Sequence, residues 1–111
     1  MKQISYDLTN VIAMSDNDSD FVKLMVHTFI KDIPRDLERL AVAVSEQDRA
    51  GVHRYAHRIK PTLELFGIES FRHAAALELW GKSDVELNIK EDFLRLNQNL
   101  SEILIQLKRD F

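Results

Sequence analysis

The fold is decided by residues 19–45, which read SDFVKLMVHTFIKDIPRDLERLAVAVS. Apolar residues recur there every three or four positions, the spacing that one buried face of an α-helix requires. The members of this face are Phe21, Leu24, Met25, Thr28, Phe29, Ile33, Leu37, Leu40 and Val44. The period continues through Pro34, which predicts one long helix, kinked where the proline ring removes the bond to the Ile30 carbonyl. Two helices that meet near Ile33 are the alternative.

Shorter helical patterns lie on both sides of this stretch. The predicted helices are residues 8–14, 49–66, 69–80, and a last one from Ile89 to near the C-terminus. Asp7 and Asp48 are predicted N-caps, and residues 83–86 and 88–91 resemble capping boxes. Gly67 and Gly81 are predicted to end the helices before them, because glycine readily adopts the left-handed conformation that follows a helix.

The connections between these helices are short, so successive helices are expected to pack antiparallel. Three Gly and two Pro in 111 residues also disfavour an all-β chain with many turns. The predicted fold class is therefore all-α, an up-and-down antiparallel four-helix bundle with a short additional N-terminal helix. The length and the 45% hydrophobic content suit a single domain over residues 1–111.

Composition excludes several classes of function. A net charge of −3 argues against a nucleic-acid-binding surface, which needs clustered positive charge. The absence of cysteine excludes disulfides, thiolate chemistry and most structural zinc sites, and suits a reducing cytoplasm. Residues 1–7 lack the apolar stretch of a signal peptide, and no run of apolar residues is long enough to span a membrane.

The helix predicted from Arg49 to Phe66 carries the candidate site. On a wheel of about 100° per residue, its apolar face opposes His57. That face consists of Val52, Tyr55, Ile59, Leu63 and Phe66. Within about 60° of His57 lie His53, Lys60, Pro61 and Glu64. His57 is thus predicted to be a solvent-facing imidazole with a cation one turn away.

This pair of residues suits phosphoryl transfer. A neutral imidazole, with an ordinary pKa of about 6.5, is a nucleophile at neutral pH without an adjacent base. The Lys60 ammonium could offset the charge of a phosphoryl group on the ring. Such His and Lys pairs are also common on the surfaces of unrelated helices, so the pair alone is a weak signal.

The surrounding residues 56–68, AHRIKPTLELFGI, resemble the histidine-containing phosphotransfer (HPt) domain family. In that family's motif the phosphorylated histidine is followed by Lys at the third position, a small residue, then Ser, Thr or Ala, and Gly at the tenth. His57, Lys60, Pro61, Thr62 and Gly67 occupy these positions. The order and lengths of the predicted helices also resemble the family. Pro61 departs from the usual glycine, which places partner choice and the local helix geometry in question.

The resemblance implies a function and a set of roles. His57 would accept a phosphoryl group through Nε2 from a receiver-domain aspartate, as in a hybrid sensor histidine kinase, and pass it to the receiver of a response regulator. Lys60 would stabilise the phosphoryl charge and Arg58 would contribute more weakly, while Thr62 would orient the helix. The chain would be a monomeric phosphocarrier without kinase activity or cofactor, because the Mg²⁺ would be held by the receiver.

Two other functions are open at this point. The bundle could dock a receiver or another protein without carrying phosphate. His53 and His57 also have a spacing that can seat a metal, but the nearest further ligand is Glu64 and there is no cysteine, so no metal is expected. The basic face formed by Arg54, Arg58 and Lys60 is either a solvated surface or a patch that steers an acidic receiver pocket.

Overall fold

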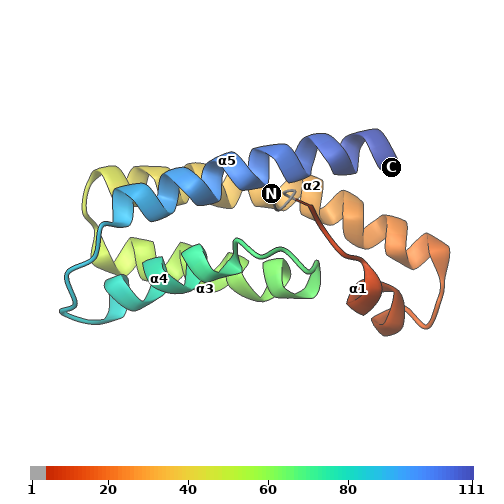
Figure 1. The fold of residues 1–111 in the computed structure, drawn as a ribbon, viewed down its shortest axis with the longest axis horizontal. Coiled ribbons are helices and arrows are strands. Elements are labelled where there is room, and N and C mark those ends of the chain that lie inside the picture. Colours follow the sequence, from red (N-terminus) through yellow and green to blue (C-terminus); the bar gives the residue numbers. More distant parts are fainter. Residues whose placement is uncertain (1–4) are drawn as a thin grey trace.

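The computed structural model describes residues 5–111, which form five helices (Figure 1). Residues 1–4 lie outside the described residues. They belong to the stretch, residues 1–7, in which the sequence predicts no signal peptide. The helices are α1 (Thr9–Met14), α2 (Ser19–Ser45), α3 (Arg49–Leu65), α4 (Phe71–Lys82) and α5 (Ile89–Asp110). The described part of the chain contains no strand, so the all-α prediction is confirmed.

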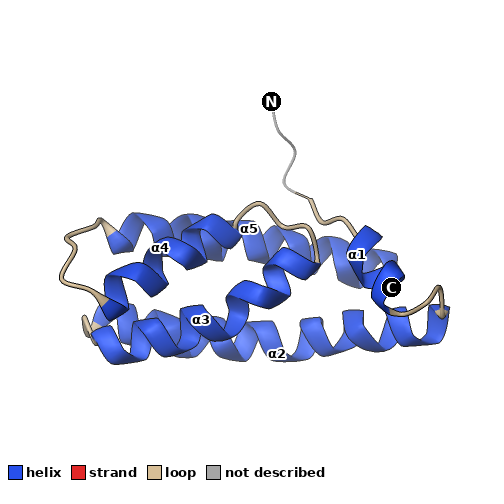
Figure 2. Ribbon diagram, turned by 90° about the horizontal axis from the view of Figure 1, so that it is seen from below, coloured by secondary structure: helices blue, strands red, loops and turns tan. Residues whose placement is uncertain are grey.

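The four longer helices form one bundle. α2 packs against α3, α3 against α4, α4 against α5, and α5 against α2, so that each helix has two neighbours around a shared core. The short helix α1 lies beside α2, at the end of the bundle where α2 begins and α5 ends (Figures 1 and 2). This arrangement confirms the four-helix bundle with a short N-terminal helix. None of the helices in residues 5–111 is long and apolar enough to cross a membrane.

Helix α2 runs without interruption from Ser19 to Ser45, with Pro34 inside it. The prediction of one long helix is therefore confirmed and the alternative of two helices is wrong. The Asp18 carboxylate caps the helix by accepting from the backbone N–H groups of Asp20 and Phe21 at 3.0 and 3.3 Å. Pro34 is exposed, so its ring points away from the core.

The predicted buried face of α2 is wrong between residues 21 and 28. Val22 and Val26 enter the core there, whereas Phe21 and Leu24 are 40% and 61% exposed and Thr28 is exposed. The two sets share a helical period and differ only in phase, so the apolar pattern could not separate them. The exposed set lines a groove between α2 and α3 that lies close to the candidate site.

Helix α4 differs from its prediction at both ends. It begins at Phe71 and ends at Lys82, so Gly81 lies inside the helix and does not terminate it. Gly81 packs directly on α3: a Cβ there would lie 2.5 Å from the His53 backbone nitrogen and 2.6 Å from the Arg49 carbonyl oxygen. The glycine serves close helix packing, which is the other common reason for glycine in a helix.

The caps agree with the sequence at two of the predicted places. The Asp48 carboxylate accepts from the Gly51 N–H at 3.1 Å, and the Asn88 side chain accepts from the Glu91 N–H at 3.3 Å. The predicted capping box at residues 83–86 is wrong, because α4 ends there and the next helix starts only after Asn88.

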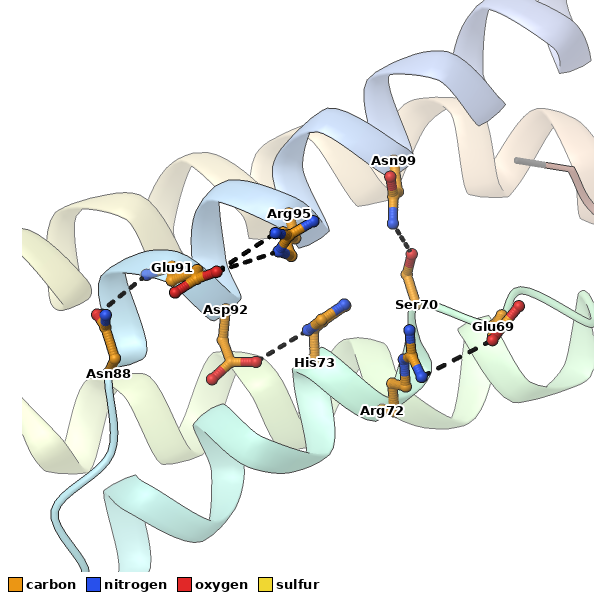
Figure 3. Close-up of polar contacts among 9 residues, drawn as sticks. All are labelled: Glu69, Ser70, Arg72, His73, Asn88, Glu91, Asp92, Arg95 and Asn99. Atoms are coloured by element: carbon orange, nitrogen blue, oxygen red, sulfur yellow. Dashed lines mark hydrogen bonds and ion pairs between the residues drawn. The ribbon is translucent and has the colours of Figure 1, made fainter. Parts of the chain in front are cut away.

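Polar side chains join α4 to α5 along the side of the bundle shown in Figure 3. The His73 ring contacts the Asp92 carboxylate at 2.8 Å, and the Asn99 amide donates to the Ser70 hydroxyl (Figure 3). His73 is half-buried. These contacts fix α4 between α3 and α5, and α4 supplies one side of the candidate site.

Gly67 ends α3 as predicted. Its φ is +63°, and the Ile68 N–H donates to the Leu63 carbonyl at 3.0 Å, which completes a Schellman motif. The N-terminal segment passes over this turn, so that a Cβ on residue 67 would lie 2.7 Å from the Asp7 Cβ. Glycine is required here both for its positive φ and for this close approach.

Candidate functional site

His57 lies in the middle of α3 on its exposed face. Its side chain is 64% exposed, while Val52, Ile59 and Leu63 on the opposite face are fully buried or nearly so. This orientation agrees with the helical wheel. Tyr55, which the wheel places in the core, is only half-buried.

A buried glutamate that the sequence analysis missed lies beside His57. The Oε1 atom of Glu78, from α4, is 3.2 Å from Nδ1 of His57. The Glu78 side chain is only 7% exposed, and its other oxygen, Oε2, forms an ion pair with the Lys60 ammonium at 3.1 Å. The Lys82 ammonium is 3.8 Å from Oε1. Three basic side chains from two helices therefore surround one buried carboxylate.

These contacts determine the ionisation of Glu78. Burial alone would raise the pKa of the carboxyl, but the Lys60 ammonium and the His57 ring outweigh it and hold the pKa below the usual value. The carboxylate is therefore ionised at neutral pH and can only accept hydrogen bonds. Consequently Nδ1 of a neutral His57 carries the proton, and the lone pair is on Nε2, on the side of the ring away from Glu78.

The lowered pKa of Glu78 predicts how stability depends on pH. A carboxyl whose pKa is lower in the folded state stabilises the fold above its usual value of 4.5, and this contribution is lost as the pH falls through the folded-state pKa. We expect Glu78→Gln to be less stable than the parent at pH 7, with a smaller difference at pH 3. Urea unfolding of both proteins across this range measures the difference. A difference that stays constant with pH would contradict the prediction.

His53 lies one turn before His57, with its ring stacked on the His57 ring. The ring centroids are 5.7 Å apart and the ring planes are inclined by 16°. His53 is half-buried, and its Nδ1 is buried without a hydrogen-bond partner. A proton on that atom would be buried and unpaired, so the neutral form of the His53 ring would carry its proton on Nε2. Within the described residues, no three His, Asp or Glu side chains gather as metal ligands.

Arg58 points away from His57, toward α2. Its Nε atom is 3.7 Å from Oδ1 of Asp36, a buried carboxylate of α2. Arg58 and Thr62 line the groove between α2 and α3, a cavity of about 340 Å³. Phe21, Leu24 and Met25 supply apolar lining from the other side. The groove thus lies on the α2 side of the exposed face of α3, and Glu78 lies on its α4 side.

The remaining predicted site residues, Pro61, Glu64 and Gly67, lie in α3 or shortly after its end, at different distances from His57. Pro61 and Glu64 are exposed on the face that carries His57. Gly67 lies beyond the end of α3 and has the structural role described above. The structure therefore stacks His53 on His57 and places Lys60 on the carboxylate that contacts His57. Pro61 and Glu64 are exposed, and Arg58 and Gly67 lie away from the ring.

The sequence did not predict Glu78 and Lys82 as site residues, because they lie on a different helix from His57. Leu79 is 43% exposed and Glu78 is buried, so the actual core face includes a charged residue. No local pattern in the sequence indicates this burial, which depends on how α4 packs on α3. Glu78 lies three residues before Gly81, the residue that packs on α3, and positions three apart share one face of a helix.

The comparison with protein families agrees with this geometry. The family model described as the Hpt domain matches residues 24–109, which include α3, α4 and nearly all of α2 and α5. Comparisons with curated proteins and with solved structures gave no significant match. The matched segment contains His57 and the two side chains that lie against its ring, His53 and Glu78.

Proposed function

Because the chain belongs to the Hpt domain family, whose members are phosphotransfer modules of two-component signalling, we propose that it carries a phosphoryl group on His57. The donor would be the phosphoaspartate of a receiver domain, as in a hybrid sensor histidine kinase. The acceptor would be the aspartate of a second receiver, in a response regulator. The protein would act as a carrier in this relay and not as a kinase.

One observation carries the proposal: the Nδ1 atom of an exposed histidine is held by a buried carboxylate. This contact keeps the proton on Nδ1 and orients the ring, so that Nε2 presents its lone pair to solvent. A surface histidine without such a partner would divide its proton between the two nitrogens. The arrangement suits a nucleophile that accepts a group from another macromolecule.

The proposed transfer would use this geometry in the following step. Nε2 attacks the phosphorus atom of the acyl phosphate, a bond forms between Nε2 and phosphorus, and the bond between phosphorus and the aspartate oxygen breaks. The electron pair of that bond leaves with the aspartate carboxylate. The ring keeps the proton on Nδ1 and gains positive charge, which the Glu78 carboxylate stabilises across 3.2 Å. Mg²⁺ would be supplied by the receiver and would offset charge on the transferred group.

Lys60 contributes positive charge to the site in this proposal. Its ammonium lies 3.1 Å from Glu78 Oε2, so it balances the buried carboxylate that orients His57. Without that balance, an ionised Glu78 would repel an incoming phosphoryl group. This extends the role that the family resemblance implies for Lys60.

The groove between α2 and α3, which includes Arg58, the residue after His57, would offer a receiver domain an apolar surface. The groove between α2 and α3 exposes Phe21 and Leu24, and Arg58 lies at its α3 side. Exposed apolar side chains next to a reactive residue are typical of a partner surface. We propose that the protein is a cytoplasmic monomer that meets its receivers here, without nucleic acid or membrane as a partner.

The proposal is tested by incubating the protein with phosphorylated receiver domains from the same genome. We expect at least one receiver to produce a phosphoprotein that is labile to acid and stable to base, with His57 as the modified residue. Radiolabelled ATP alone is expected to give no label. A receiver that binds the protein without transferring phosphate would favour a docking module, and labelling by ATP without any kinase would contradict the carrier function.

Pro61 is expected to affect stability more than transfer. Proline inside a helix costs about 3 kcal/mol relative to alanine and glycine about 1, but a helix packed around the proline recovers only part of the difference. Pro61→Gly should therefore gain roughly 0.5–1.5 kcal/mol in urea unfolding at an unchanged m-value. Its transfer rate should change by less than about threefold, because glycine is no bulkier than proline.

The matched variant for docking is Pro61→Gln, which places a long side chain one turn from His57. It should impair transfer far more than Pro61→Gly does. Unchanged transfer by Pro61→Gln would show that residue 61 does not line the docking surface.

A further inference from the structure

The HPt motif of α3 contains one lysine near the histidine, but a second lysine reaches the same site from α4. The Lys82 ammonium lies 3.8 Å from Glu78 Oε1, the oxygen that also contacts His57 Nδ1 at 3.2 Å. Lys60 contacts the other oxygen, Oε2. Lys82 and His57 therefore contact the same oxygen of Glu78, whereas Lys60 contacts the other oxygen.

The two lysines differ in how tightly they are held. Lys60 is 28% exposed and lies 3.1 Å from a carboxylate oxygen, whereas Lys82 is 54% exposed and lies 3.8 Å from its partner. The Lys60 ammonium would have to leave a buried carboxylate to contact a new anion. Breaking such a buried pair is costly, while an exposed and longer contact such as that of Lys82 contributes little. Lys82 is the cation that can move at the lower cost.

The packing of α4 fixes Lys82 next to α3. Gly81, its neighbour in sequence, lies so close to α3 that a Cβ would be 2.5 Å from the His53 backbone nitrogen. The last turn of α4 therefore touches the turn of α3 that precedes His57. The backbone of Lys82 lies next to this contact between the helices, and its long flexible side chain can reach the exposed side of the His57 ring.

We propose that Lys82 is the residue that contacts the phosphoryl group on His57, and that Lys60 acts mainly through Glu78. This inference rests on the proposed function and names the residues that serve it. A phosphoryl group on Nε2 carries up to two negative charges and three acceptor oxygens. When it arrives, the Lys82 ammonium exchanges its contact with Glu78 for a contact with a phosphoryl oxygen. Lys60 stays on Glu78 and keeps that carboxylate neutralised.

The test uses phosphoramidate, a small phosphoryl donor that does not depend on receiver docking. The parent, Lys82→Ala and Lys82→Arg are labelled on His57, with Lys108→Ala as the control because Lys108 is an exposed lysine at the far end of α5. The ³¹P signal of the phosphohistidine is then titrated with pH. The ¹⁵N signals of the unphosphorylated His57 ring report whether the contact with Glu78 is intact.

We expect Lys82→Ala to titrate its phosphoryl group at a higher pH than the parent, because a nearby cation stabilises the more highly charged form. Labelling should slow by about 3- to 10-fold, as for the loss of one exposed charge-assisted contact. Lys82→Arg should resemble the parent, Lys108→Ala should be unchanged, and the ¹⁵N signals of His57 should be the same in all four proteins.

Two results would overturn the inference in different ways. If the parent is labelled on His57 but Lys82→Ala has the parent's ³¹P titration and labelling rate, Lys82 does not contact the phosphoryl group and the proposed function stands. If the parent takes up no phosphate on His57 from phosphoramidate or from any receiver, the proposed function fails and this inference fails with it.

Discussion

Replacing His57 by glutamine is expected to abolish phosphoryl uptake from a phosphorylated receiver while leaving the helical circular dichroism spectrum unchanged. Glutamine has no nucleophilic nitrogen, so the rate should fall by more than about 10³-fold, as for the loss of other nucleophiles. The fold should tolerate the change because the side chain is 64% exposed. Glu78 keeps Lys60 and Lys82 as partners in the variant, so no buried carboxylate is left alone.

The matched control is His53→Gln, in the stacked neighbouring histidine. His53 is half-buried and its Nδ1 faces the protein interior, so it is poorly placed to attack a phosphoryl group on a partner. We expect this variant to keep most of the uptake, measured with the same receiver and the same acid and base stability of the label. Loss of labelling in His53→Gln with retention in His57→Gln would reverse the assignment of the acceptor.

Much of this fold was predictable from the sequence because the signals for a helix, its apolar spacing and its capping residues, lie within or next to the helix itself. The apolar residues of α2 keep their helical spacing on both sides of Pro34. Asp48 and Asn88 cap helix starts with their side chains, and Gly67 ends a helix with its positive φ. These signals lie within a few residues of the feature they specify. Prediction of α1, α2, α3 and α5 needed nothing more.

The errors in the fold arose where contacts between helices decide the outcome. Gly81 looks like a helix terminator in the sequence, yet it stays helical because α3 leaves no room for a side chain. Phe21 and Leu24 fit an apolar period, yet Val22 and Val26 fill the core and leave the other two exposed. Both cases depend on the position of a neighbouring helix, which a single segment of sequence does not contain.

The residues of the candidate site also fall into two groups, those that the sequence brings together and one that only the packed bundle adds. His57, His53 and Lys60 share one helix, so a helical wheel brings them together. Glu78 lies 21 residues further along the chain, on another helix, and its burial beside His57 is a property of the packed bundle. This carboxylate explains the orientation of the ring, which the motif on α3 alone does not explain.

Replacing Lys60 by alanine is expected to slow phosphoryl transfer by roughly 10- to 100-fold, which corresponds to a charge-assisted interaction of about 1.5–3 kcal/mol. From the sequence, Lys60 looks like an exposed charge whose loss would not affect stability. The structure corrects this expectation, because Lys60 is only 28% exposed and is paired with a buried carboxylate. We expect the variant to lose about 1 kcal/mol in urea unfolding, less than for a fully buried pair because His57 and Lys82 still contact Glu78.

The origin of the slow transfer can be separated with a second substitution, Glu78→Gln. Without Lys60, the ionised Glu78 draws Lys82 inward and repels the phosphoryl group, so the rate loss comes largely from an unbalanced carboxylate. Glutamine at position 78 can still accept from His57 Nδ1 but carries no charge. The double variant should therefore transfer within about fivefold of Glu78→Gln alone, a strong departure from additivity. If Lys60→Ala slows transfer equally in both backgrounds, Lys60 contacts the phosphoryl group directly, and its ion pair with Glu78 is incidental to transfer.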